Sequence, residues 1–405
     1  MNGGPKADFF FLPAWPPSGS VVLWVSLTIV IAGLLGELAF RWLRLPRVVG
    51  YAGVGTLLSA FDLGIGGTQL NSSLRLIVDL AMALLLFEMG CRIPLRWLRT
   101  NPWLLATSLL ESVLTFALVL ATLLWLDVNL RLALPAAAIA IATSPAVVMR
   151  VASECNASGQ VTERLIMLTG LNTFYAALAS KFVVGWLHAE YYGNWVTSLA
   201  HPLYLLTGSA IVAALLAFAV AQLTRRLDLR NENSTLLLLG LILLALSVTK
   251  MANLSTLLVP LLAGLFLRNS TERPWIWPRH FGTAGGALVL MLFVVTGSVW
   301  SVHAITTGAL LGLALIAARG LAKLVTTVVL ASPSGISARQ GVALGIAMTP
   351  MSGVALVLMS DLQTLYPEFA AGLTFIVFSA VAMLELIGPI AVYLALRTVR
   401  EGSIR

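Results

Sequence analysis

Charged residues are scarce in this chain of 405 residues. Asp, Glu, Lys and Arg make up 10% of the sequence, whereas 59% of the residues are hydrophobic and the mean hydropathy is +0.94. An average soluble protein carries about 25% charged residues, because its surface must be polar. The shortage of charge therefore excludes a soluble protein of this length and predicts an integral membrane protein.

Residues that build catalytic and metal sites are also few. The chain has two cysteines, Cys91 and Cys155, and four histidines, and none of them falls in a Cys/His cluster with metal-ligand spacing. The sequence contains neither a Walker motif nor a G-x-G-x-x-G turn after a strand. We therefore expect free thiols, no cofactor, no metal except a transported monovalent cation, and no enzyme; a mid-membrane glutamate pair is the one catalytic alternative left open.

Apolar windows of about twenty residues predict about thirteen membrane-spanning helices. We place them at residues 20–40, 48–62, 72–92, 102–127, 131–153, 161–187, 201–223, 234–251, 254–268, 282–302, 304–330, 338–361 and 370–397.

The basic residues predict how these helices are oriented. When the loops are assigned alternately to two sides, eighteen of the 25 lysines and arginines fall on one side and four on the other, while Lys181, Arg319 and Lys323 lie within helices. Positively charged loops mark the cytoplasm, so we expect the inner (plasma) membrane, with the N-terminus outside and the C-terminus cytoplasmic. Because the basic residues are spread over helix ends, the net charge of +8 does not indicate a nucleic-acid partner.

Two of the apolar segments are interrupted in the middle by proline and small polar residues. They read AIAIATSPAVVMR at residues 138–150 and AMTPMSGVALVLM at residues 347–359. The interrupting residues are Thr143, Ser144, Pro145, Thr349, Pro350, Ser352 and Gly353. Proline opens a helix, and opened backbone within a bilayer is tolerated only where protein or a water-filled cavity satisfies it. Two broken helices, one in each half of the chain, indicate a transport site near the bilayer midplane.

The broken helices belong to two similar trios, at residues 102–187 and 304–397. Each trio consists of a long helix, a broken helix and a helix with polar residues midway. Equivalent members are seven helices apart, an odd number, so the trios are inverted in the membrane. The predicted fold is thus an all-α polytopic membrane protein, one transmembrane domain over residues 1–405, with inverted repeats and two unwound, crossing helices.

Four ionisable residues fall near the middle of predicted helices: Glu111, Glu385, Arg319 and Lys323. A charge within a bilayer costs about 2.5–3.5 kcal/mol on insertion scales, so such residues are functional candidates and need partners. Either glutamate can pair with Arg319 or Lys323 across the crossing, and a purely structural ion pair is the alternative to a functional one.

Three other charged residues have simpler interpretations. Asp79 can pair with Arg75 and Glu88 with Arg92, each four residues apart on one helix. Lys181 lies near the outer end of its helix, where its side chain can extend to water.

Two glycine pairs predict close helix packing. Gly308 with Gly312 and Gly341 with Gly345 have the G-x-x-x-G spacing that lets helix backbones approach one another.

Five motifs along the chain resemble those of a known family. They are RLPRVVGY (44–51), LLLFEMGCRIPL (84–95), IATSPAVVMRV (141–151), SARQGVALGIAMTPMSGVALVL (337–358) and LELIGPI (384–390). In this order they are similar to the cation/proton antiporter superfamily, in particular to the branch with the bacterial sodium/proton exchangers and the Kef-type potassium efflux proteins. The resemblance covers nearly the whole chain.

This resemblance implies a secondary transporter that exchanges Na⁺ or K⁺ for protons. It implies a homodimer in which the two trios form a core that moves like an elevator against a scaffold made by the remaining helices. It also implies that a basic residue, here Arg319 or Lys323, balances charges at the unwound site. In proteins of this kind the crossed, unwound helices supply backbone dipoles, and an Asp on the helix after the first break binds cation and proton in competition.

The sequence departs from the family pattern on that helix. Where members carry Asp-Asp, Asn-Asp or Gln-Asp, this chain has Asn172 and Thr173, and residues 165–187 contain no carboxylate. Thr173 offers a neutral oxygen but cannot titrate, so either Glu385 or Glu111 takes the proton or proton coupling is absent. The ion-site candidates are Thr143, Ser144, Asn172, Thr173, Thr349, Ser352, Glu385 and Glu111. The alternative function is a protein of antiporter fold without proton coupling, either a channel-like pathway or a membrane sensor or partner subunit.

Overall fold

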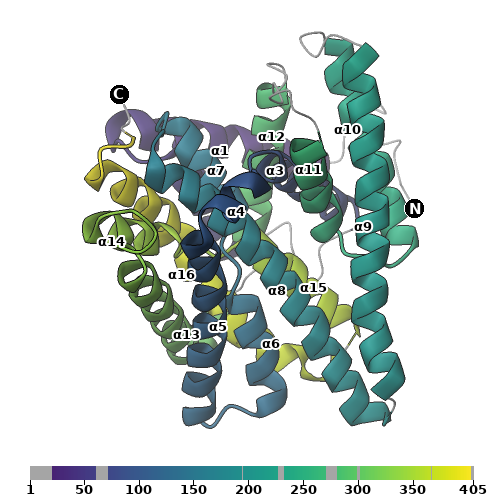
Figure 1. Cartoon of the computed structure of the whole chain (residues 1–405). Coiled ribbons are helices and arrows are strands. Elements are labelled where there is room, and N and C mark those ends of the chain that lie inside the picture. The colour runs from purple at the N-terminus through teal and green to yellow at the C-terminus, as the bar shows by residue number, and fades with distance from the viewer. Residues whose placement is uncertain are drawn as a thin grey trace, which may run out of the picture.

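The computed structural model describes residues 21–60, 72–193, 195–226, 232–270, 281–298, 302–365 and 367–402. Within these ranges the secondary structure is entirely helical (Figure 1). The helices are α1 (Val21–Trp42), α2 (Arg47–Ala60), α3 (Ser72–Cys91), α4 (Leu95–Thr100), α5 (Pro102–Trp125), α6 (Leu130–Ala140), α7 (Pro145–Glu154), α8 (Gln160–Tyr192), α9 (Trp195–Arg226), α10 (Glu232–Met251), α11 (Leu258–Ser270), α12 (Phe281–Ser298), α13 (Val302–Val329), α14 (Ala338–Ala347), α15 (Gly353–Leu365) and α16 (Pro367–Thr398).

Each predicted membrane segment corresponds to one helix or to a broken pair. The segment at 131–153 is α6 followed by α7, and the segment at 338–361 is α14 followed by α15, so both predicted breaks are confirmed. The short helix α4, after Pro94, was not predicted because its six residues fall between two apolar windows. The first twenty residues, including part of the first predicted segment, lie outside the described residues.

Six helices of the described chain are long and apolar enough to cross a membrane, with α6 and α7 taken together as one. Five of these six belong to the two trios, and the sixth lies in α9. Shorter apolar helices are found within α10, α11, α12 and α15. The total of thirteen spans stays a prediction.

The broken helix α6/α7 lies at the centre of the bundle. Its apolar window is 89% buried, whereas those of α5 and α13 are 39% buried. Helices α5 and α13 therefore present a large part of their surface to the surroundings and shield the breaks on one side. In Figure 1, α6 lies below α7 and α14 lies above α15, so the two broken helices run in opposite directions. The inversion of the whole trios stays a prediction.

The helices pack in two groups. In one group, α13 packs on α5, α14 and α16, and α6 packs on α5 and α8; in the other, α11 packs on α3 and α9, and α12 packs on α2 and α3. The groups meet along α8 with α9, α3 with α7, and α2 with α16. The helices named in the first group belong to the two predicted trios, and those named in the second group lie outside the trios.

The two predicted glycine pairs lie at close helix contacts. A Cβ atom added to Gly308 would collide with the Phe375 carbonyl oxygen of α16, and one added to Gly341 would lie 2.7 Å from the Thr327 carbonyl oxygen of α13. These contacts hold α13 against α16 and α14, so the long helix that carries Arg319 and Lys323 is placed precisely relative to the second break.

Candidate functional site

The two breaks touch each other directly. The Ser144 backbone N–H donates to the Pro350 carbonyl oxygen at 2.9 Å, and the Ser144 and Ser352 hydroxyl oxygens are 2.7 Å apart. The Thr143 hydroxyl contacts the Met348 carbonyl oxygen at 3.3 Å. We call residues 141–144 and 348–352 the crossing. Opened backbone and hydroxyl groups from both halves of the chain are thus in direct contact at the crossing.

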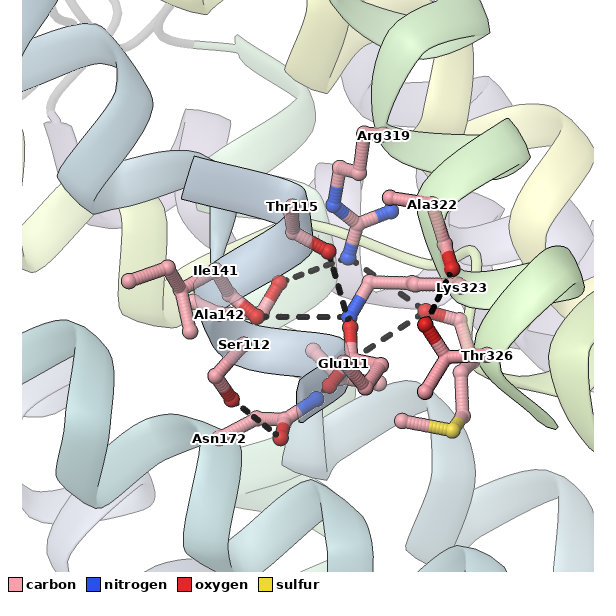
Figure 2. Close-up of polar contacts among 12 residues, drawn as sticks. Glu111, Ser112, Thr115, Ile141, Ala142, Asn172, Arg319, Ala322, Lys323 and Thr326 are labelled. Atoms are coloured by element: carbon pink, nitrogen blue, oxygen red, sulfur yellow. Dashed lines mark hydrogen bonds and ion pairs between the residues drawn. The ribbon is translucent and has the colours of Figure 1, made fainter. Parts of the chain in front are cut away.

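Arg319 satisfies the opened backbone at the crossing. Its guanidinium donates to the carbonyl oxygens of five residues from both broken helices. They are Ala140 at 2.8 Å, Ala142 at 2.6 Å, Met348 at 3.3 Å, Pro350 at 3.2 Å and, in a shorter contact, Thr349. Figure 2 shows Arg319 with one of them, Ala142. The last carbonyls of a helix have no partner within it, so one side chain here caps the C-terminal ends of α6 and α14 together. The planar guanidinium, with five donors, suits this task better than an ammonium group.

Lys323, one turn further along α13, forms a fully buried ion pair with Glu111 of α5. Its ammonium group also lies 3.2 Å from the Thr143 hydroxyl and 3.4 Å from the Ile141 carbonyl oxygen. The Thr115 hydroxyl donates to the same Glu111 oxygen at 3.0 Å, and the second carboxylate oxygen has no partner among the described residues. A carboxylate, a hydroxyl and a carbonyl therefore surround the ammonium with oxygen atoms.

Asn172 reaches the crossing, whereas Thr173 does not bond to it. The Asn172 amide donates to the Thr143 hydroxyl at 3.2 Å and accepts from the Ser112 hydroxyl at 3.3 Å (Figure 2). The Thr173 hydroxyl donates to the Thr169 carbonyl oxygen of its own helix at 2.9 Å. Asn172 is therefore the position of the pair at which a carboxylate would join the polar network.

Thr349 contributes its backbone rather than its side chain. The Thr349 hydroxyl donates to the Ile346 carbonyl oxygen at 2.8 Å, while the Thr349 carbonyl oxygen accepts from Arg319. Ser144 and Ser352, in contrast, meet through their side chains.

Glu385 lies apart from these residues. Of the two glutamates predicted as partners for Arg319 and Lys323, Glu111 is the partner of Lys323, and Glu385 contacts the Thr296 hydroxyl of α12 instead. The ion pair expected for Arg319 is wrong, because backbone carbonyls take its place. Glu385 is 1% exposed, and its second oxygen has no partner in the described part of the chain.

The charges at the crossing balance with the help of the backbone. Lys323 and Glu111 neutralise each other, which leaves the positive charge of Arg319. A helix C-terminus carries roughly half a negative charge, so the ends of α6 and α14 together offset one guanidinium. In the part of the chain that the structure describes, no acidic side chain bonds to the N-terminal ends of α7 and α15 at the crossing, where the family pattern would place an aspartate.

Other charged residues partly follow the predictions. Glu88 pairs with Arg92 at 2.7 Å, as expected. Asp79 pairs with Lys250 of α10 at 2.5 Å rather than with Arg75, and Lys181 pairs with Asp361 of α15 at 2.7 Å rather than extending to water. Both corrected partners lie on helices distant in sequence, so local spacing could not identify them.

A cavity of about 230 Å³ lies between α3, α7 and α12. Its lining includes Leu85, Arg92, Arg150 and Val289, which places it on the side that the basic loops predict to be cytoplasmic. One turn deeper, Met82 and Leu292 contact the start of α15, where a Cβ on Gly353 would lie 2.8 Å and 3.8 Å from their side chains. The cavity thus leads toward the second break, and two apolar side chains separate them.

Sequence reasoning missed Ser112, Thr115 and Thr296. Hydroxyl residues in helices commonly bond to their own backbone, so a single Ser or Thr carries no signal by itself. Thr115 follows Glu111 by four residues on one helix, and that spacing was the available sign that it bonds to Glu111.

Comparison with known proteins fits this geometry. The profile of the family described as "Sodium/hydrogen exchanger, transmembrane" matches residues 26–396. The chain belongs to this sodium/hydrogen exchanger family. The match covers both broken helices and all the charged residues described above. Among curated proteins, the comparison finds no match.

Two solved structures of the sodium proton antiporter MjNhaP1 from Methanocaldococcus jannaschii share the fold. The structure at pH 8 has a TM-score of 0.68 and 17% sequence identity, with 94% of this chain and 95% of that chain covered. A structure from an electron-microscopy map has a TM-score of 0.73 and 16% identity, with 94% and 97% covered. At these identities the likeness shows the antiporter fold, which confirms the predicted fold class.

Proposed function

We propose that this exchanger-family protein moves a monovalent cation, Na⁺ or K⁺, across the inner membrane in exchange for protons. The observation that carries the proposal is the oxygen cradle around the Lys323 ammonium. Glu111, Thr143 and the Ile141 carbonyl hold a positive charge deep in the bundle, next to opened backbone. Carboxylate, hydroxyl and carbonyl oxygens are also the ligands that hard cations prefer.

In this proposal, Lys323 and the transported cation compete for the same oxygen atoms. When the ammonium withdraws, Glu111, Thr143 and Asn172 supply oxygen ligands, with Ser144 and Ser352 beside them. Thr173 and Thr349 contribute backbone carbonyl oxygens or bind water molecules that surround the cation. Arg319 stays in place and keeps the crossed helix ends neutral, so the cradle persists when it is empty.

Access to the site changes by movement of the two trios, residues 102–187 and 304–397, against the other helices. The cavity between α3, α7 and α12 supports this step, because it separates one trio helix from two helices of the other group. We infer that the remaining helices form the scaffold of a homodimer, and that the N-terminus lies outside and the C-terminus in the cytoplasm.

The test is cation flux in proteoliposomes that carry an imposed pH gradient and a pH-sensitive dye. Addition of Na⁺ or K⁺, but not of choline, is expected to dissipate the gradient. Glu190→Gln is a suitable control, because Glu190 pairs with Arg131 in a partly exposed position distant in sequence from the crossing residues. A folded, reconstituted protein that moves none of the alkali cations would contradict the proposal.

One observation favours a second candidate, an antiporter-fold protein without proton coupling. In the described part of the chain, the N-terminal ends of α7 and α15 lack the expected aspartate. The family pattern places it at Thr173, next to Asn172, whose side chain reaches Thr143. Asn172→Asp places a carboxylate beside Thr143, whereas Thr173→Asp places one on a position that bonds to its own helix. If the wild type does not exchange and Asn172→Asp does, the second candidate is correct and the missing carboxylate is the reason.

A further inference from the structure

Glu385 is a buried carboxyl group that the cation cradle does not use. It lies on α16, and its Oε1 contacts the hydroxyl of Thr296 on α12, which belongs to the other group of helices. Its Oε2 is buried without a partner among the described residues. A carboxylate usually accepts several hydrogen bonds or faces a cation when it is buried, so this environment is unusual for an ionised group.

No basic side chain on the helices packed against α16 is paired with Glu385. Each charged residue with a described side chain there has another partner. They are Arg47 with Glu37, Arg131 with Glu190, Arg150 with Glu154, Asp361 with Lys181, Lys323 with Glu111, Arg319 with the crossing, and Arg339 with the Thr398 carbonyl oxygen. Glu385 therefore faces no counter-ion from these elements.

The hydrogen bonds of Thr296 are compatible with a proton on Glu385. The Thr296 hydroxyl contacts two acceptors, a Glu385 oxygen and the Phe293 carbonyl oxygen at 3.2 Å. A hydroxyl has one hydrogen and can donate only one of these bonds. The hydroxyl donates to Glu385 when the carboxyl group is ionised. When Glu385 is protonated, Thr296 accepts from it and donates to Phe293, so that both contacts are hydrogen bonds. Only a protonated carboxyl group can donate in this way.

Glu385 also lies next to the second break. Gly388, one turn further along α16, packs against Pro350, and a Cβ on Gly388 would lie 3.0 Å from the Pro350 Cβ. A change at Glu385 can thus act both on the contact between the two groups of helices and on the crossing.

We propose that Glu385 carries the exchanged proton, and that its protonated form, bound to Thr296, holds α16 against α12 in this conformation. When water reaches the pair from one side, the O–H bond of the carboxyl breaks and the proton passes to water. The carboxylate that remains is costly in this buried position, so it favours an arrangement in which Glu385 is hydrated. Uptake of a proton from water on the other side restores the neutral acid and the contact with Thr296.

The protonation state can be tested without transport. Infrared difference spectra of wild type against Glu385→Gln, recorded in lipid at neutral pH, are expected to show the carbonyl-stretch band of a protonated carboxylic acid in the wild type alone. Wild type against Glu190→Gln is the matched control and is expected to lack this band. A carboxylate band at Glu385 under these conditions would overturn the proposal.

A second experiment measures transport and rests on the proposed exchange activity. In proteoliposomes, Glu385→Gln is expected to abolish pH-driven exchange. Thr296→Val is expected to retain it but to move the pH of half-maximal exchange downward by up to about one unit, because the protonated carboxyl group loses the hydroxyl that accepts its hydrogen bond. Thr249→Val removes a buried hydroxyl that bonds to its own helix and should leave the pH profile unchanged.

The infrared and transport experiments together distinguish failure of the proposed function from failure of the role assigned to Glu385. If the wild type shows no exchange, the proposed function fails, and the infrared band still decides the state of Glu385. If the wild type exchanges and Glu385→Gln does so with the same pH profile, the assignment of the proton to Glu385 is wrong while the exchange activity stands.

Discussion

At the scale of single residues, Arg319 shows how a protein keeps opened backbone stable inside a membrane. Five carbonyl oxygens from two chain segments converge on one side chain. Each buried polar group without a partner costs about 1–3 kcal/mol, so the loss of this side chain affects several groups at once.

We therefore expect Arg319→Ala to lower the stability of the folded protein by about 3–5 kcal/mol, the range for loss of one partner in a buried ionic network. Arg319→Lys should recover only part of this loss, because an ammonium has three donors and no fork geometry. Thermal unfolding in detergent measures both effects. Arg41→Lys, at an exposed residue, is the control, and equal unfolding temperatures for Arg319→Ala and wild type would refute the capping role.

Substitutions of Lys323 and of Glu111 are expected to shift the apparent KM for the cation in opposite directions. Lys323→Met removes the competing ammonium and should lower the apparent cation KM by about tenfold, which corresponds to about 1.4 kcal/mol. Glu111→Gln removes the carboxylate ligand and should raise this KM. The double variant should be more stable than either single variant, since no buried charge is left alone. Flux against cation concentration and unfolding temperatures test the pair; KM shifts in the same direction would contradict the competition.

Cys155 provides a pH prediction outside the membrane-spanning segments. Both cysteines are free and buried, as expected for thiols in this setting. Burial, with a smaller contribution from the Glu154 carboxylate, raises the pKa of the Cys155 thiol to about 11. Because the thiolate is the reactive form, maleimide labelling of the folded protein should be slow at neutral pH and accelerate only as the pH approaches 11. Rapid labelling of the folded protein at neutral pH would contradict the buried environment described for the Cys155 thiol.

At the scale of helices, α13 offers a matched pair of glycine substitutions. Gly308 packs against the backbone of α16, whereas nothing lies within 4 Å of a Cβ on Gly320 of the same helix. Gly308→Val should separate α13 from α16 and greatly reduce the yield of folded protein. Gly320→Ala should be neutral or stabilise the helix by up to about 1 kcal/mol. Size-exclusion profiles and unfolding temperatures compare the two, and a tolerated Gly308→Val would contradict the close contact.

The helices themselves show what sequence reasoning can and cannot reach. The breaks were predictable, because Pro145 and Pro350 act on their own local backbone. The choice between Asn172 and Thr173 was not, because adjacent helix residues point about 100° apart and only packing fixes which one faces the crossing. Lys250 as the partner of Asp79 was equally hidden, since it comes from a helix far along the chain.

At the scale of the whole molecule, hydropathy and the order of motifs were sufficient for the fold. The bilayer restricts a long apolar chain to helices, and the pair of broken helices then narrows the architecture. The sequence could not show how the two groups of helices meet, because that depends on the surfaces of many side chains. The packing of the two groups places Glu385 against Thr296 of α12 instead of beside Arg319.

A cross-link between the two groups of helices tests whether they move against each other during exchange. Met149 of α7 and Val289 of α12 line the same cavity from opposite groups. With cysteines at both positions, a short bifunctional thiol reagent should stop exchange, and each single-cysteine variant should stay active after the same treatment. The buried native thiols should not interfere. Full activity of the cross-linked double variant would show that the groups need not move against each other.

The guanidinium at the crossing also has an electrical consequence. Arginine stays charged at any pH that a cell encounters, and no proton released or taken up elsewhere can discharge it. Any displacement of α13 along the membrane normal therefore carries this charge through the transmembrane field, which does about 2.3 kcal/mol of work per 100 mV for a full passage. Membrane voltage acts on the position of this helix even when the cradle holds no ion.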